Sequence, residues 1–328
     1  MQYRVLGKTG FKISEVALGT WQLGGKWGEP YDEKNAEATL QKAVEEGINF
    51  FDTADVYGDR HSERSIGKFV RGISDRVYVA TKCGRRLSPH DSAGYNDTNI
   101  RQFVEDSLEN MQLETLDLIQ LHCPPTEVYY RPEVFETLDA LKKEGKILHY
   151  GVSVEKVEEA LKAIEYPGMA SIQIIFNMFR QRPAELFFPQ AKKKNVGIIV
   201  RVPLASGLLS GKFKKDTRFG AQDHRFFNRE GKAFDKGETF SGVDYNTGIE
   251  AVEELKKLFS EKANLAQIAL RWVLMFKEVS CVIPGASRVD QVEPNAQSSE
   301  LSPLTDAQMK GVQAIYEKHF KSVVHQLW

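Results

Sequence analysis

Four ionisable side chains follow short apolar runs in the first half of this chain, and together they could deliver a proton to a reacting oxygen atom. They are Asp52, Tyr57, Lys82 and His122. A tyrosine, whose ordinary pKa is about 10, is a weak acid near neutral pH, and a neighbouring ammonium group favours its ionised form. We therefore expect Lys82 to lower the pKa of Tyr57, and Asp52 to keep Lys82 protonated and oriented.

The fourth member of the set could act on the substrate. His122 can donate a hydrogen bond to a carbonyl oxygen, or it can tune Tyr57. Such a set protonates a developing alkoxide, which suits hydride addition to a carbonyl group. Each residue also has a structural interpretation, because Asp52 could cap a turn and a single Lys or His at a strand end is often structural. Their joint occurrence after successive apolar runs favours catalysis.

These side chains can meet only if the apolar runs are neighbouring parallel strands. Eight runs are apolar on both faces and bounded by turn or polar residues, which is typical of buried strands. They cover residues 15–18, 48–51, 77–81, 116–121, 148–152, 171–176, 196–202 and 280–283. In an α/β barrel, side chains at the carboxyl ends of the strands line the active site.

Segments with helical periodicity separate the runs. They cover residues 35–46, 99–111, 132–143, 155–164, 184–194, 248–263, 266–276 and 305–320. Pro132 suits the first turn of a helix, and Gly47 and Gly145 lie just past predicted helix ends. Eight strands alternating with helices predict a parallel sheet. We expect one (β/α)8 TIM-barrel domain over residues 1–328.

Two segments fall outside this alternation. Residues 3–13 predict a small hairpin, turned at Thr9 and Gly10, that covers the bottom of the barrel. Residues 213–246 are rich in Gly, Asp and Phe and show weak periodicity, so we expect a long loop after the seventh strand. Long loops in compact domains are usually functional, and this one could fold over the cofactor as a lid.

The composition argues against several classes of partner. The 328 residues include 44 basic and 45 acidic side chains, a balance that gives no electrostatic reason to expect nucleic acid or an anionic membrane. Cys83, Cys123 and Cys281 lie far apart, and neither they nor the histidines have metal-ligand spacing. The first residues lack a signal-peptide pattern, and no apolar run could span a bilayer. We expect a cytoplasmic protein without a metal.

A resemblance to a known family becomes specific at these residues. Residues 52–58 read DTADVYG, which resembles the DTAxxYG signature of the aldo-keto reductase superfamily. Lys82 and His122 match the other two members of its catalytic tetrad. The resemblance extends from Leu18 to Gly285, and it is strongest to the prokaryotic branch related to the general stress and inositol-utilisation reductases, and to potassium-channel β subunits.

The resemblance also implies an NADP(H) site. No GxGxxG motif follows the first strand, and the glycines at 207 and 211 are one residue short of a P-loop. The family pattern instead places Ser153 and Gln173 on the nicotinamide carboxamide, although Val154 stands where the family usually has Asn. Arg201 stands where many relatives carry an aromatic ring stacked on nicotinamide, and an Arg plane can also stack.

Two further segments complete the implied cofactor site. Residues 203–212 resemble the pyrophosphate loop, and residues 283–288 open the last helix, where Ser287 and Arg288 suit the adenosine 2′-phosphate. We expect no acidic side chain nearest that phosphate, although Asp290 is close, so NADP is favoured over NAD. The alternative is a capped helix with a surface arginine. The expected cofactor contacts are Thr20, Trp21, Ser153, Gln173, Arg201, Val202, Pro203, Leu204, Ser206, Gly207, Leu208, Lys212, Arg218, Gly285, Ser287, Arg288, Gln291 and Asn295.

The substrate side is less specific. We expect Trp21 to form a wall of the pocket and Tyr57 its floor. Cys123, followed by two prolines, stands where some relatives have Trp-Pro, which predicts a wider pocket there. Trp27 could be a substrate contact or a structural residue of its loop. Arg85 and Arg86 could attract an acidic substrate or lie on the surface.

These features predict an NADPH-dependent oxidoreductase that reversibly reduces a small aldehyde or ketone, with Tyr57 as the general acid. Two alternatives remain open. Lys82 could be the nucleophile of a Schiff-base aldolase. The chain could instead be a non-catalytic subunit that senses the redox state of nicotinamide. We expect a monomer or a weak homo-oligomer whose ligand, apart from the cofactor, is a small carbonyl compound or alcohol.

Overall fold

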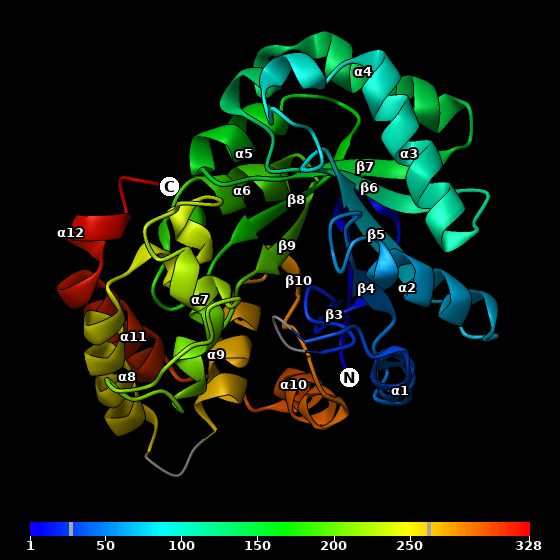
Figure 1. The fold of residues 1–328 in the computed structure, drawn as a ribbon. Coiled ribbons are helices and arrows are strands. Elements are labelled where there is room, and N and C mark those ends of the chain that lie inside the picture. The colour runs from blue at the N-terminus through cyan, green and yellow to red at the C-terminus, as the bar shows by residue number, and fades with distance from the viewer. Residues whose placement is uncertain (26–28, 261–263) are drawn as a thin grey trace.

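Eight parallel strands form a curled sheet in this computed structural model, which describes residues 1–25, 29–260 and 264–328. The strands pair in chain order (Figure 1). They are β3 (Leu18–Gly19), β4 (Phe50–Asp52), β5 (Tyr78–Cys83), β6 (Leu116–His122), β7 (Ile147–Ser153), β8 (Met169–Ile175), β9 (Gly197–Arg201) and β10 (Val279–Val282). All eight predicted strands are confirmed, with ends displaced by a few residues. Two isolated parallel bridges, Val16 to Val282 and Gly19 to Gly285, join the first and last strands.

The helices lie around the outside of this sheet (Figure 1). They are α1 (Glu33–Glu45), α2 (His61–Arg71), α3 (Asp97–Met111), α4 (Pro132–Lys143), α5 (Val157–Ala163), α6 (Phe187–Lys193), α7 (His224–Phe227), α8 (Tyr245–Phe259), α9 (Leu265–Leu274), α10 (Val292–Gln297), α11 (Asp306–His319) and α12 (Lys321–Val324). Asp32, Asn96, Asp244 and Asn264 cap α1, α3, α8 and α9 by accepting backbone N–H bonds. Gly47 and Gly145 have positive φ angles just past helix ends, as predicted.

Two helix assignments need correction. Helix α2 was not predicted, because it has few apolar positions, Ile66, Phe69 and Val70, and all of them lie in its second half. Residues 283–288 do not open the last helix: a 3₁₀ turn at Val289–Gln291 and the short α10 follow them, and α11 and α12 come later. The predicted helix end at 261–263 lies outside the described residues, and so does Trp27.

Alternation along the strands determines which side chains enter the interior of the sheet. Phe50, Ala80, Leu118 and Ile199 belong to a small apolar cluster inside the curl, whereas their neighbours pack outward against the helices. Because side chains on one face recur every second residue, positions two or four residues further along face the same interior. Asp52, Lys82, His122 and Arg201 occupy those positions.

The N-terminal hairpin lies against the amino ends of the strands, as predicted. Strands β1 (Tyr3–Val5) and β2 (Lys12–Ser14) pair antiparallel, and Leu6 and Phe11 join the interior cluster. Phe11 stacks on Tyr78 at the start of β5, with ring centroids 4.3 Å apart. The hairpin therefore closes the interior from below with apolar side chains.

The segment 213–246, which we name the covering segment, is not the structureless loop expected from its weak periodicity. It contains α7 and two 3₁₀ turns, Lys236–Glu238 and Phe240–Gly242, and its last residues belong to α8. The C-terminal Trp328 fastens it: the indole Nε1 donates to Asp235 Oδ1 at 2.8 Å, and Arg180 lies over the indole ring.

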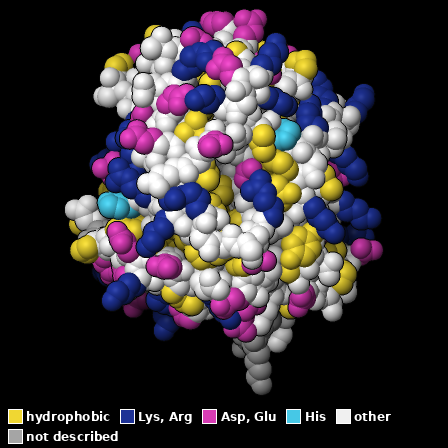
Figure 2. Space-filling model, turned by 90° about the vertical axis from the view of Figure 1, so that its right-hand side faces the viewer, with side chains coloured by type: hydrophobic (Ala, Val, Ile, Leu, Met, Phe, Trp, Pro, Cys, Tyr) yellow, Lys and Arg dark blue, Asp and Glu magenta, His cyan; other side chains and the backbone are white. Residues whose placement is uncertain are grey.

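Neither a membrane-spanning helix among the described residues nor a single-sign charge patch on the face shown in Figure 2 is found. Among the described helices, none has both the length and the hydropathy that crossing a bilayer requires. Cationic and anionic side chains are interspersed over the face shown in Figure 2. This agrees with the near-neutral charge of the chain.

Two glycines of the hairpin provide a test of its packing. Gly7 and Gly10 both have positive φ, but a Cβ on Gly7 would lie 2.2 Å from the backbone nitrogen of Gly197, whereas one on Gly10 would meet nothing within 4 Å. We expect Gly10→Ala to reduce the free energy of unfolding by roughly 1–2 kcal/mol. Gly7→Ala should reduce it by about 1–3 kcal/mol more, because backbone atoms must move. Urea denaturation measures both, and equal losses would contradict this packing.

Candidate active site

A buried ion pair organises the carboxyl ends of the central strands. Lys82 Nζ lies 2.5 Å from Asp52 Oδ1, and both side chains are almost completely buried. The same ammonium donates to the Thr53 carbonyl oxygen at 2.9 Å and to Tyr57 Oη at 3.3 Å. The structure therefore brings three of the four predicted residues into direct contact, with Lys82 between the carboxylate and the phenol.

Two amide side chains complete the environment of the carboxylate. Gln173 Nε2 donates to Asp52 Oδ2 at 2.7 Å, and Gln120 Nε2 donates to the same oxygen at 3.2 Å. Gln173 thus contacts Asp52, whatever further contact it makes with a cofactor. Gln120 was missed from the sequence, although strand alternation places it on the same face as His122 two residues later. A polar residue at an interior strand position was the available signal.

The expected direction of the Tyr57 pKa shift is wrong. Burial raises the pKa of Tyr57 above its ordinary value, and this outweighs the opposing effect of the Lys82 ammonium. Burial also disfavours a charged Lys82, but the charge and hydrogen-bonding effects of Asp52 and Tyr57 together outweigh it, so the pKa of Lys82 is raised and the ammonium persists. Tyr57 accordingly keeps its proton at neutral pH.

His122 and Trp21 both pack against the Tyr57 ring. The imidazole meets it edge-on with centroids 5.9 Å apart, and the Trp21 indole stacks at 6.2 Å. Burial, followed by the cations Arg85 and Lys82, holds the pKa of His122 well below its ordinary value. The neutral ring therefore carries one N–H donor. His122 Nδ1 is buried and has no partner among the described residues.

Thr20 belongs to a buried chain of hydroxyl groups. Thr53 Oγ1 donates to Ser62 Oγ, which donates to Thr20 Oγ1, and Thr20 Oγ1 donates to the Asp52 carbonyl oxygen at 2.8 Å. This chain ties α2 to the ends of β3 and β4. The Thr20 hydroxyl is thus engaged with the protein, and α2, which carries Ser62, supports the position of Asp52.

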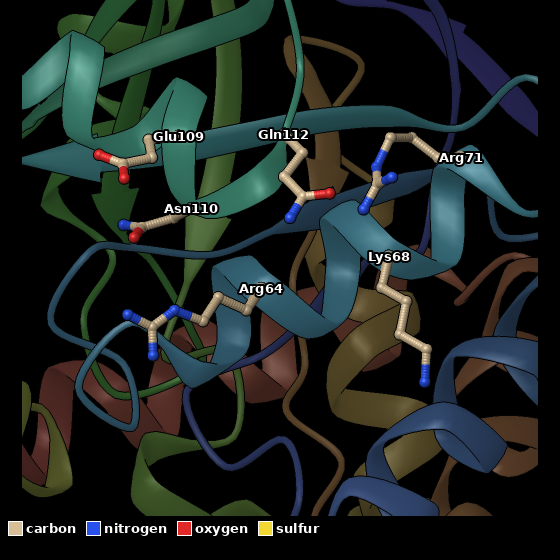
Figure 3. A pocket seen from close by; sticks show the side chains of 6 residues that line it. All are labelled: Arg64, Lys68, Arg71, Glu109, Asn110 and Gln112. Atoms are coloured by element: carbon tan, nitrogen blue, oxygen red, sulfur yellow. The ribbon is translucent and has the colours of Figure 1, made fainter.

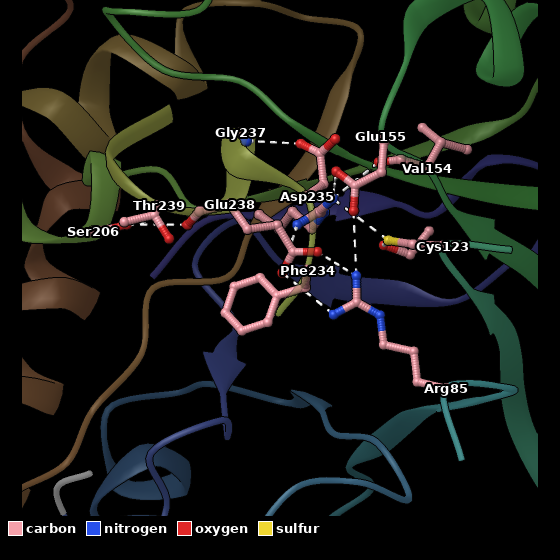
Figure 4. Close-up of polar contacts among 12 residues, drawn as sticks. Arg85, Cys123, Val154, Glu155, Ser206, Phe234, Asp235, Gly237, Glu238 and Thr239 are labelled. Carbon is pink, nitrogen blue, oxygen red and sulfur yellow. Dashed lines mark hydrogen bonds and ion pairs between the residues drawn. The ribbon is translucent and has the colours of Figure 1, made fainter. Parts of the chain in front are cut away.

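A second buried charge cluster lies above the tetrad, where the covering segment meets the strand ends (Figure 4). Arg85 pairs with Glu238 through both Nη atoms, and its Nη2 reaches Glu155 Oε1 at 3.2 Å. Arg201 Nη2 donates to Glu155 Oε2 at 2.9 Å, and Arg201 Nη1 lies 3.6 Å from Glu238 Oε2. Arg85 is therefore not a surface residue, whereas Arg86 pairs with Asp59 near the surface.

Three of these groups also meet a geometric criterion for a metal site. Within the described ranges, ligand atoms of Cys123, Glu155 and Glu238 lie within 4.8 Å of one another. Both carboxylates already contact the guanidinium groups of Arg85 and Arg201. Burial raises the pKa of the Cys123 thiol to about 12. We interpret Glu155 and Glu238 as ion-pair partners of the two arginines and not as metal ligands. A metal ion at this point would lie next to two guanidinium groups and would be repelled by them.

The residues resembling a pyrophosphate loop have an unusual backbone. Val202, Ala205, Ser206 and Gly207 all have positive φ angles. Left-handed conformations at a β-branched valine and an alanine are costly, and such strain concentrates at functional sites. The Ser206 hydroxyl bridges to the covering segment, donating to the Glu238 carbonyl oxygen and accepting from the Phe240 N–H.

The segment expected to bind the 2′-phosphate is folded around a side-chain oxygen. Gln291 Oε1 accepts hydrogen bonds from Ser287 N, Ser287 Oγ and Arg288 N. Arg288 forms a bidentate pair with Asp290, at 2.8 and 2.9 Å. Asp290 is therefore close to this site, as expected, and it pairs with the arginine predicted to bind the 2′-phosphate. The donors that a phosphate needs are nevertheless gathered in one place.

The other expected cofactor residues are distributed around these two segments. Lys212 and Arg218 are exposed, and Lys212 is close enough to Asp290 to lower the pKa of that carboxyl, after the larger effect of Arg288. Asn295 Nδ2 lies 3.5 Å from the Gly285 carbonyl oxygen. Ser153 is buried and its Oγ lies 3.4 Å from Cys123 Sγ. Pro203 and Leu208 are buried, and Leu204 is half-buried.

A separate pocket lies on the outer helices (Figure 3). Its lining is polar or charged and comes from α2 and the end of α3: Arg64, Lys68, Arg71, Glu109, Asn110 and Gln112. None of the tetrad residues lines it. We therefore place the candidate active site at the strand ends and not in this pocket.

The chain matches one protein family over most of its length. Residues 15–317 match the model of the aldo/keto reductase family. The chain belongs to this family, and it is an oxidoreductase.

Individual relatives agree with the family assignment. An uncharacterised oxidoreductase of Bacillus subtilis, YqkF, is 28% identical over 97% of this chain and 99% of its own length. A probable voltage-gated potassium channel subunit β of Arabidopsis thaliana is 28% identical over 93% of both chains. The structure of a glycerol dehydrogenase from Gluconobacter oxydans superposes with a TM-score of 0.77 at 32% identity, covering 97% of this chain and 95% of that chain. The predicted resemblance to bacterial oxidoreductases and channel subunits is confirmed.

The buried ion pair can be tested by a double-mutant cycle. Lys82→Gln leaves the Asp52 carboxylate buried without its cation, and we expect the free energy of unfolding to fall by about 3–5 kcal/mol. Adding Asp52→Asn should recover much of this loss, because the remaining amide can still accept from Gln173. Urea denaturation of the two single variants and the double variant gives the coupling energy. Strictly additive losses would contradict a direct interaction.

Proposed function

We propose that this protein reduces small aldehydes or ketones with NADPH, and that Tyr57 is the acid that protonates the carbonyl oxygen. The contact of Lys82 Nζ with both Asp52 and Tyr57 carries this proposal. Tyr57 supplies the proton, and Lys82, held by Asp52, compensates the charge that the phenolate then carries. His122 donates its N–H to the substrate oxygen and orients it. In the reverse direction the same residues oxidise an alcohol.

The cofactor of this family is NADP(H), and the residues present fit it. When bound, NADPH supplies the hydride that adds to the carbonyl carbon. The strained backbone at 202–207 and the exposed Lys212 suit a pyrophosphate, because backbone N–H groups and an ammonium favour anions. Ser287 and Arg288 would hold the 2′-phosphate, with the Gln291 oxygen, which now accepts their hydrogen bonds, giving way. Ser153 and Gln173 would hold the nicotinamide carboxamide.

The environment of Lys82 argues against the aldolase alternative. A Schiff-base lysine must lose its proton to attack a carbonyl carbon. Lys82 is buried, paired with Asp52, and has a raised pKa, so its amine is not available as a nucleophile. This arrangement suits a permanent charge beside the proton donor.

We also propose that the strands form a complete barrel. We infer that the curled sheet closes into one (β/α)8 domain over the chain. The bridges from Val16 to Val282 and from Gly19 to Gly285 support this closure. A closed sheet has no free edge in the middle of the molecule, and its interior is filled by side chains, as the apolar cluster below the tetrad is.

Replacing the proposed acid should separate binding from turnover. Tyr57→Phe removes the proton donor but keeps the ring, and we expect turnover of NADPH with a panel of aldehydes to fall by about 10²–10⁴-fold. NADPH affinity, measured by fluorescence titration, should remain within a factor of a few. Near-normal turnover would show that another group is the acid. Tight NADPH binding to the unmodified chain without any turnover would favour the redox-sensing alternative.

The raised pKa of Tyr57 also sets the pH profile of the unmodified enzyme. A raised pKa preserves the acid form, so kcat/KM for reduction should stay level between about pH 6 and 9 and fall only above the ordinary tyrosine value of about 10. His122 is already neutral in this range and should add no limb near pH 6.5. A decline of reduction between pH 7 and 8 would contradict this account.

The 2′-phosphate assignment can be tested with two variants of one ion pair. Arg288→Ala should weaken NADPH binding roughly 10–100-fold and leave NADH binding nearly unchanged, because only NADPH carries the 2′-phosphate. Asp290→Asn frees Arg288 and should strengthen NADPH binding. Fluorescence titration with both cofactors measures the effect. Equal weakening of NADPH and NADH in Arg288→Ala would remove the assignment.

A further inference from the structure

The charge cluster above the tetrad already holds a carboxylate between two arginines. Glu238, on the covering segment, contacts Arg85 through both carboxylate oxygens and lies 3.6 Å from Arg201 Nη1. Planar guanidinium groups bind carboxylate and phosphate oxygens in this manner. The contact thus demonstrates that the site accommodates an anionic group.

The cluster retains a guanidinium donor that no acceptor satisfies. Arg85, Arg180 and Arg201 contribute three guanidinium groups, beside the carboxyl groups of Glu155, Asp235 and Glu238 (Figure 4). Burial raises the pKa of Glu155, which therefore tends to keep its proton, whereas Arg85 and Arg201 hold the pKa of Glu238 below its usual range in spite of burial. Arg201 Nε is buried and has no acceptor among the described residues. An unpartnered guanidinium donor in a buried site indicates an acceptor that the chain itself does not supply.

The cluster also lies beside the reacting groups. Arg85 follows Lys82 by three residues, and its charge affects both Tyr57 and His122. Its guanidinium lies 6.0 Å from the centroid of Phe234, and Phe234 packs against Trp21. Trp21 in turn stacks on the Tyr57 ring. A substrate whose carbonyl reaches Tyr57 would therefore extend toward Arg85.

Glu238 can leave this position more easily than a residue of a regular element. It ends a 3₁₀ turn in the covering segment, which reaches the cluster from outside the sheet. A buried ion pair stabilises a fold weakly, because the desolvation of both ions offsets most of their attraction. An incoming anion that takes over the contacts with Arg85 would keep that guanidinium paired when the Glu238 side chain moves away.

We propose that Arg85, with the charge of Arg201 beside it, forms a subsite for an anionic group at the far end of the carbonyl substrate, and that Glu238 occupies this subsite in the absence of substrate. The favoured substrates are aldehydes or ketones that carry a carboxylate or a phosphate. This inference rests on the proposed reductase function, and it adds the substrate class.

Matched pairs of substrates test the subsite. We would measure kcat/KM with NADPH for succinic semialdehyde against its methyl ester, and for glyceraldehyde 3-phosphate against glyceraldehyde. The charged member of at least one pair should be favoured about tenfold or more, as expected for hydrogen bonds to a charged group. A preference in one pair alone identifies carboxylate or phosphate as the group recognised. Equal kcat/KM within both pairs would overturn the proposal.

Three variants assign any preference to the cluster. Arg85→Gln should remove it, whereas the matched control Arg86→Gln, whose side chain pairs with Asp59, should keep it. Glu238→Gln removes the internal competitor and should increase the preference severalfold. Two outcomes would show that the cluster only holds the covering segment in place. One is a preference for the charged substrate that survives Arg85→Gln. The other is an equal loss of kcat/KM on charged and neutral substrates in Glu238→Gln.

A binding measurement separates this inference from the reductase proposal. Succinate and inorganic phosphate are titrated by calorimetry into the unmodified protein, Arg85→Gln and Arg86→Gln, each with NADP⁺. The subsite is supported if the affinity for either anion falls about tenfold in Arg85→Gln but not in Arg86→Gln. This result would hold even if no aldehyde is reduced. Reduction of neutral aldehydes without such binding keeps the reductase and overturns the subsite.

Discussion

A lysine ammonium and an aspartate carboxylate share the interior of the curled sheet, where neither is open to water. Removing two such ions from water costs several kcal/mol each, so the pair persists only if every remaining polar atom is satisfied. The Thr53 carbonyl oxygen, Gln120 and Gln173 provide those contacts. The alternation of the strands, the apolar cluster below and the hairpin that closes it all serve to hold Lys82 and Asp52 at this depth.

The depth of the site also decides how Tyr57 can react. Burial raises the pKa of the phenol more than Lys82 lowers it, so Tyr57 keeps its proton, as the proposed acid of the reduction must. The same burial, with Arg85 and Lys82, keeps His122 neutral and able to donate one hydrogen bond. Trp21, packed against His224 and Phe234 of the covering segment, contributes to this dry environment. Catalysis and the covering segment are thus linked through desolvation.

The cluster above the tetrad joins parts of the chain that are distant in sequence. Arg85 follows β5, Glu155 follows β7, Arg201 ends β9, and Glu238 comes from the covering segment. One set of contacts therefore links the proposed substrate subsite to the segment that covers the site. Exchange of Glu238 for a substrate anion would couple recognition of the substrate to the position of that segment.

The sequence alone determined the eight strands and the tetrad, because buried parallel strands are apolar on both faces and their carboxyl ends meet at one edge. It did not reveal α2, whose apolar positions are few, nor the order within residues 213–246, which arises from contacts such as that between Asp235 and Trp328. Only the tertiary structure paired Arg85 with Glu238, 153 residues apart, and only it showed that burial reverses the expected shift in the pKa of Tyr57. Strand patterns are local, whereas ion pairing between distant segments and desolvation depend on the whole fold.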